Sequence, residues 1–303
     1  MPRNIKKLSS FFSLFADFYH YYQPFIELLT MPKVQINGID LFYDIKGTGE
    51  PLLLIAGFFC DHAYWSLIMP SLISHYQVIR LDNRGMGRSS APQSQYSIKE
   101  MAGDVAALLD RIGIDKVHLA GHSMGGQIAQ ELALAYPKKV QSLILLSSLA
   151  KGDEFFNSII ETWGELLSYV DLKLYEKMVL PWIFTDAFYS IPGMIEGLIE
   201  FAIRYPFPPA THSLYHHSRA MLDFDTVDRL QQIDCPTLVL VGKQDILTPL
   251  KFSQQLAQGI PNSELVVIDR GGHGFLIESS DAVVSAMLNF LQKLKPTHTN
   301  FGF

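Results

Sequence analysis

The sequence has little that would suit cross-linking or metal binding. It contains only two cysteines, Cys60 and Cys235, and neither belongs to a CxxC pair. None of its ten histidines lies in an HExxH arrangement. We therefore expect no zinc or other metal and no organic cofactor. Two reduced thiols suit a cytoplasmic protein, because disulfides are rare in that compartment, but the sequence leaves a single bridge open.

Charge is also sparse. Charged residues make up 18% of the chain, the formal net charge is −6, and lysine and arginine form no cluster. A protein that neutralises several phosphates needs such a cluster, so nucleic acid is not an expected partner. With 303 residues, of which 48% are hydrophobic, the chain is long enough to bury a large core in one domain or in a domain with an insertion.

Long uninterrupted hydrophobic runs are missing, including at the N-terminus. Over residues 8–29 apolar side chains recur every three or four positions, which predicts an amphipathic helix. Asp17 and Glu27 interrupt it, so no transmembrane span is expected. Residues 1–30 form an N-terminal extension that either packs on its own domain, precedes a start at Met31, or docks on a surface or a second copy. The expected location is the cytoplasm. The docking and leader alternatives leave membrane association or export open as other locations.

From Met31 the pattern changes to strands alternating with helices. Asn37-Gly38 divides an alternating stretch and predicts a hairpin. The apolar run 51–57 predicts a strand buried on both faces. Ser97 and Glu100 form a capping box at the start of a helix. Further strands are expected at 76–82, 116–121, 140–148, 236–242 and 263–269.

This alternation predicts an α/β fold with a doubly wound, mostly parallel sheet. Residues 151–231 break the rhythm, because they are rich in aromatic residues and helical patterns that prolines divide into short pieces. We expect them to form a helical cap inserted into a core made of 31–150 and 232–296, followed by a loose tail at 297–303.

Three residues with the chemistry for acyl transfer follow three of these strands. Ser123 lies in the sequence GHSMGG, where a sharp turn between strand and helix would expose a nucleophile. Asp245 and His273 each follow a later strand. The order Ser, Asp, His is the one that this architecture imposes. His273 would take the proton of the serine, and Asp245 would orient the imidazole and stabilise its cation.

Acyl transfer also needs donors for the developing oxyanion. The backbone N–H of Met124 is one expected donor, and the N–H of Phe58, after the strand 51–57, is the other.

These residues resemble the α/β-hydrolase superfamily, in its capped serine esterase and lactonase branch. The resemblance rests on GHSMGG, on DNRGMGRSS at 82–90, on LVGKQDILTP and on GGHGFLIE, and the layout is most similar to 3-oxoadipate enol-lactonases. It implies the sheet, the cap and a hydrolytic triad, with a chiefly structural role for the turn at 82–90. Many relatives carry His-Gly where this chain has Ala56-Gly57.

The cap is expected to supply the pocket wall. Trp163 and Trp182 either line it or form the core of the cap, and Arg204 and Arg219 either hold a substrate carboxylate or lie in solvent. The function expected is that of a serine hydrolase acting on a small ester or lactone through an acyl-enzyme. The alternatives are a carbon–carbon bond hydrolase of a dienone acid and a ligand receptor built on the same fold.

Overall fold

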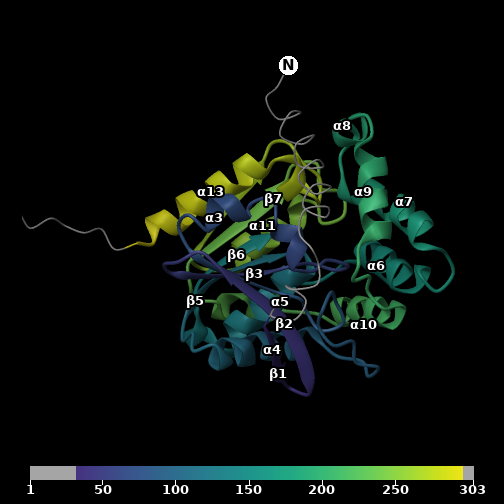
Figure 1. The fold of residues 1–303 in the computed structure, drawn as a ribbon. Helices are drawn as coiled ribbons and strands as arrows, with labels where there is room; N and C mark the ends of the chain where they lie inside the picture. The colour runs from purple at the N-terminus through teal and green to yellow at the C-terminus, as the bar shows by residue number, and fades with distance from the viewer. Residues whose placement is uncertain (1–31, 296–303) are drawn as a thin grey trace, which may run out of the picture.

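The computed structural model describes residues 32–295, which form one eight-stranded sheet flanked by helices (Figure 1). The strand order is β1-β2-β4-β3-β5-β6-β7-β8. The first two pairings are antiparallel and the others are parallel, which confirms the predicted α/β class. The strands are β1 Lys33–Ile36, β2 Ile39–Lys46, β3 Pro51–Ile55, β4 Gln77–Leu81, β5 Val117–His122, β6 Val140–Leu146, β7 Thr237–Gly242 and β8 Ser263–Ile268.

The hairpin at the start of the sheet forms where the sequence predicts it. Asn37 and Gly38 have φ values of 44° and 77°, as a tight two-residue turn requires. Cys60 and Cys235 are both free thiols. The amphipathic pattern at 8–29 lies outside the described residues. Within residues 32–295, no helix combines the length and apolar character needed to cross a membrane.

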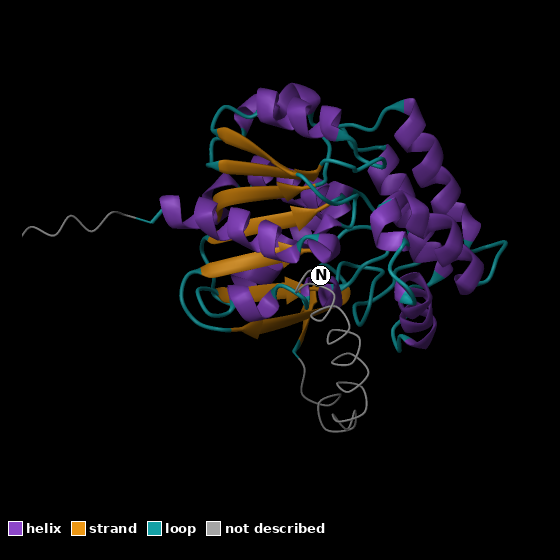
Figure 2. Cartoon of the chain, turned by 90° about the horizontal axis from the view of Figure 1, so that it is seen from above, coloured by secondary structure: helices purple, strands orange, loops and turns teal. Residues whose placement is uncertain are grey.

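Helices cover both faces of the sheet (Figure 2). Leu53 and Ile55 pack into the core on one face, whereas Leu52 and Leu54 pack on the other, because successive side chains of a strand point to opposite faces. The first face is covered by α4 Ile98–Arg111, α5 Met124–Ala135 and α11 Leu250–Gly259. The second is covered by η1 His62–Trp65, α3 Met69–Leu72, α12 Phe275–Glu278 and α13 Ser280–Lys293. The predicted capping box begins α4.

A second group of helices interrupts the alternation between β6 and β7, and we call it the helical cap. It lies beyond one end of the strands (Figures 1 and 2). Asp153, Asp171 and Thr185 each accept a backbone N–H at the start of a cap helix, which satisfies donors that a helix leaves unpaired. Its helices are α6 Glu154–Leu166, α7 Leu172–Ile183, α8 Asp186–Tyr189, α9 Met194–Arg204 and α10 Thr211–Leu222, and the short η2 Pro137–Lys139 and η3 Val227–Gln232 lie on either side of this group in sequence.

Candidate functional site

Ser123 occupies a strained turn between β5 and α5. Its φ of 54° and ψ of −120° lie in a region that residues other than glycine rarely adopt. The turn is tight because a Cβ atom on Gly121 would lie 2.2 Å from the Gly125 carbonyl oxygen, and one on Gly125 would lie 2.2 Å from the Ile55 carbonyl oxygen. Close packing of the strand against the helix therefore requires both glycines.

Replacing Gly125 with alanine is expected to lower the free energy of unfolding by about 3 kcal/mol, because the added methyl group would overlap a backbone atom that cannot move aside. The matched control is Gly103→Ala in α4, where a Cβ would meet only the Tyr136 hydroxyl at 3.9 Å. That control should gain about 0.5–1 kcal/mol from helix propensity. Urea unfolding of both variants checks the prediction, and an unchanged midpoint for Gly125→Ala would contradict it.

Asp245 and His273 lie after β7 and β8 and form a buried pair. The Nδ1 of His273 lies 3.0 Å from Oδ2 of Asp245. The other carboxylate oxygen of Asp245 accepts the backbone N–H groups of Leu247 at 3.0 Å and Thr248 at 2.7 Å. Burial opposes ionisation of Asp245, but the charge and hydrogen bond of His273, together with hydrogen bonds such as that from the Thr248 N–H, hold the pKa of Asp245 below its ordinary value.

Two residues that our sequence analysis did not assign brace this pair. The Thr248 hydroxyl, three positions after the aspartate, donates to Asp245 Oδ2 at 2.7 Å. His122 donates its Nε2–H to the carbonyl oxygen of His273 at 3.0 Å, and burial lowers the pKa of His122 to about 3. His122 is therefore neutral, and its position directly before Ser123 is the only sequence signal for this contact.

Ser123 and His273 line the same cavity of about 280 Å³, which lies between the carboxyl ends of the strands and the helical cap. No direct hydrogen bond joins the two side chains within the described part of the chain. The wall is mostly apolar and includes Phe58, Trp163 and Phe184, as is typical of small-molecule sites. The volume is at the lower end for such sites, so the cavity suits a compact ligand.

Three of the candidate substrate-binding residues, Arg204, Arg219 and Trp182, are not among the residues of 32–295 that line this cavity. The Arg204 side chain is 81% exposed and pairs with Glu200 one turn earlier. Arg219 pairs with Glu161 at 3.4 Å on the outside of the cap. Trp182 packs against Phe155. The helical pattern around each of these residues indicates which face of the helix is buried. It does not indicate whether that face lines the cavity.

The two predicted oxyanion donors lie beside the serine. Met124 is the first residue of α5. Phe58 follows Gly57, where an added Cβ would lie 3.0 Å from the Cβ of Ser123. The loop after β3 thus passes directly against the serine, and its glycine makes that approach possible.

Two acidic side chains that the sequence analysis missed also line the cavity. Glu176 in α7 is only 7% exposed, and burial raises its pKa to about 7. Asp61, on the loop after β3, accepts the Ala63 N–H at 2.8 Å and the Tyr205 hydroxyl. The signal for Glu176 was its place on the apolar face of α7, four residues after Leu172.

The raised pKa of Glu176 predicts a pH dependence of stability. The native state binds this proton more tightly than the unfolded state, so the stabilisation is complete below pH 4.5 and is lost as the pH rises through about 7. Between about pH 5 and pH 8.5, the free energy of unfolding of the wild type should fall by about 2–3 kcal/mol relative to Glu176→Gln. Urea unfolding at both pH values measures it. The exposed Glu196 provides the control, and parallel pH curves for wild type and Glu176→Gln would contradict the prediction.

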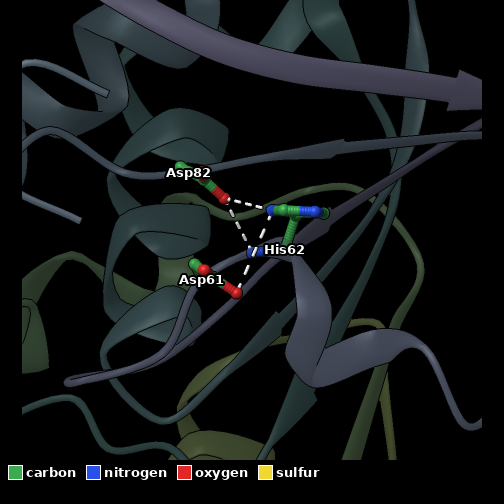
Figure 3. A group of neighbouring side chains, drawn as sticks. All are labelled: Asp61, His62 and Asp82. Atoms are coloured by element: carbon green, nitrogen blue, oxygen red, sulfur yellow. Dashed lines mark hydrogen bonds and ion pairs between the residues drawn. The ribbon is translucent and has the colours of Figure 1, made fainter. Parts of the chain in front are cut away.

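Asp61, His62 and Asp82 form the one group in residues 32–295 whose ligand atoms lie close enough to hold a metal ion (Figure 3). Oδ1 of Asp82 instead accepts the backbone N–H of His62 at 2.9 Å and lies 2.6 Å from its Nδ1. Oδ2 accepts the Arg88 N–H at 2.8 Å. These bonds hold the turn at 82–90 against the loop after β3, so the group has a structural explanation without a cation.

Residues 50–280 match the family described as the alpha/beta hydrolase fold. A protein designated carbamate hydrolase RutD, from Azorhizobium caulinodans, is 32% identical over 262 residues, which cover 86% of this chain and 98% of that protein. Among solved structures, a thermophilic esterase from Thermogutta terrifontis is 29% identical with a TM-score of 0.77, and covers 87% of this chain and 97% of its own. An enol-lactonase from Burkholderia xenovorans is 25% identical with a TM-score of 0.78, and the match covers 86% of this chain and 100% of the lactonase chain. This chain therefore belongs to the α/β-hydrolase fold family and is a hydrolase.

Proposed function

We propose that the protein is a serine hydrolase that cleaves a small ester, lactone or carbamate through an acyl-enzyme. Ser123 is the nucleophile and His273 is the general base. Asp245 orients the imidazole and stabilises its positive charge. The observation that carries this proposal is the shared cavity, which is lined by a serine on a strained turn and by a histidine paired with a buried aspartate. The relatives designated carbamate hydrolase, esterase and enol-lactonase support the same range of bonds.

The reaction follows from the positions of these groups. As Ser123 Oγ attacks the carbonyl carbon, its proton passes to Nε2 of His273, because Nδ1 faces Asp245. The N–H groups of Phe58 and Met124 stabilise the oxyanion. Collapse of the tetrahedral intermediate breaks the bond to the leaving group, which takes the proton from His273. Water then attacks the acyl-enzyme with His273 again as base and releases the acid.

Active-site labelling tests the nucleophile. A fluorophosphonate should form one adduct, which peptide mass spectrometry should place on Ser123. Hydrolysis of p-nitrophenyl esters from acetate to decanoate then distinguishes an enzyme from a ligand receptor, since steady turnover indicates an enzyme and a single burst indicates a receptor. An adduct on another residue, with turnover intact, would overturn the assignment.

Carbon–carbon bond hydrolysis of a dienone acid is disfavoured by a specific observation. That alternative needs a cation for the substrate carboxylate, and neither Arg204 nor Arg219 is among the lining residues.

We further propose that residues 151–231 act as one unit that covers the site, because side chains from four helices of the cap form much of the cavity wall.

A further inference from the structure

Resting on the serine hydrolase function proposed above, we propose that Glu176 determines which substrates enter the site. Its carboxylate accepts a hydrogen bond from an ammonium or other N–H group on the part of the substrate that does not react. The preferred substrate is therefore a compact, neutral or cationic nitrogen-bearing ester, lactone or carbamate, and substrates with a second carboxylate are rejected.

Glu176 is a buried acid without a partner. It lies on the face of α7 that lines the cavity, together with Leu172, Val179 and Leu180. In the described part of the chain, its carboxylate makes no hydrogen bond or ion pair. Buried polar groups are nearly always satisfied, and removing a charge from water without compensation is costly. An acid in this position, facing the cavity, indicates that its partner comes with the ligand.

The rest of the cavity wall also disfavours a negatively charged ligand. Among residues 32–295, those that line the cavity include Asp61 as a second carboxyl group and neither lysine nor arginine. Asp61 is already occupied, because both of its oxygens accept hydrogen bonds from Ala63 and Tyr205. Of these two carboxyl groups, Glu176 is the one that makes no hydrogen bond to residues 32–295. A carboxylate on a substrate would meet two acids in a poorly solvated space, where like charges repel strongly.

Two titratable side chains next to Glu176, Cys60 and Tyr175, remain neutral over the working pH range. Cys60, on the loop after β3, has its pKa raised to about 12 by burial. Burial also raises the pKa of Tyr175, the neighbour on the same helix. The cavity side chains from α6 and the body of α9 are apolar, and Tyr205 at the end of α9 donates to Asp61. Glu176, with a pKa of about 7, therefore changes from mostly neutral to mostly charged between about pH 6 and pH 8.5.

Binding to a variant that cannot react tests the proposal without relying on catalysis. In Ser123→Ala, calorimetry should show pentylammonium binding at least about tenfold tighter than pentanoate at about pH 8.5, as expected for a hydrogen bond between charged groups. The preference should shrink towards pH 6, where Glu176 is protonated. In Ser123→Ala with Glu176→Gln it should disappear, whereas Ser123→Ala with Glu196→Gln should retain it. The proposal would be overturned if the two probes bound equally, if pentanoate bound more tightly, or if neither bound. It would also be overturned if the preference for pentylammonium survived Glu176→Gln.

Hydrolysis provides the second measurement. The two substrates are methyl 6-aminohexanoate and monomethyl pimelate, which match in chain length. The first ends in an ammonium group and the second in a carboxylate. The ratio of their kcat/KM values should favour the ammonium ester in wild type and fall about tenfold or more in Glu176→Gln. If both esters react but the ratio does not change, Glu176 is not the selecting residue. If neither reacts while pentylammonium still binds selectively, the hydrolase proposal fails and the binding proposal stands.

Discussion

Ser123→Ala is expected to lower kcat for p-nitrophenyl esters by about 10⁶-fold, because the attacking oxygen is lost and no other group at this turn can replace it. KM should change little, since the apolar wall that binds the ester remains. Thermal unfolding should also change little, because serine and alanine share the same steric limits at a φ of 54°.

Steady-state kinetics with purified protein measures this loss, and the exposed Ser94 provides a matched control, Ser94→Ala, that should retain full activity. Residual turnover within about tenfold of wild type would show that Ser123 is not the nucleophile. It would direct attention to water activated by His273 as the attacking group.

Asp245→Asn should lower kcat by about 10⁴-fold with KM nearly unchanged. The amide can donate to Nδ1 of His273 and so favour the wrong tautomer, and it carries no charge to stabilise the imidazolium that forms when Ser123 gives up its proton. The variant should remain folded, because the neutral side chain keeps an oxygen for the N–H groups of Leu247 and Thr248.

The control for this variant is Asp269→Asn, just after β8, whose side chain is 92% exposed. Stopped-flow measurement of the fluorophosphonate reaction gives the second readout, since labelling of Ser123 should slow in parallel with kcat in Asp245→Asn. Loss of ester turnover with normal labelling would contradict the assignment, because Asp245 would then act after the serine has been acylated.

Local patterns in the sequence were sufficient for the fold. The alternation of strands and helices, the Asn37-Gly38 turn and the capping box of Ser97 and Glu100 each depend on neighbouring residues, and all three form as predicted. The candidate triad positions followed from a topological rule, because residues after parallel strands meet at one edge of the sheet. Their catalytic roles remain a prediction that the two variants above test.

The contacts made by the helical cap were beyond the reach of sequence patterns. A helical period separates a buried face from an exposed one, but it does not say whether the buried face meets another cap helix or the cavity. For this reason the sequence left open whether Arg204 and Arg219 reach the site, and neither is among the residues that line the cavity. For the same reason Glu176 was missed, although it lines the cavity.

By itself, then, the sequence determined the sheet, the turn at Ser123 and the order of the three candidate catalytic residues, because short-range spacing and strand topology are sufficient for each. Only the tertiary structure decided the charge and size of the cavity. Those depend on how α7 and its neighbours pack over the strand ends, which brings Glu176 and Asp61 into one apolar space with Ser123.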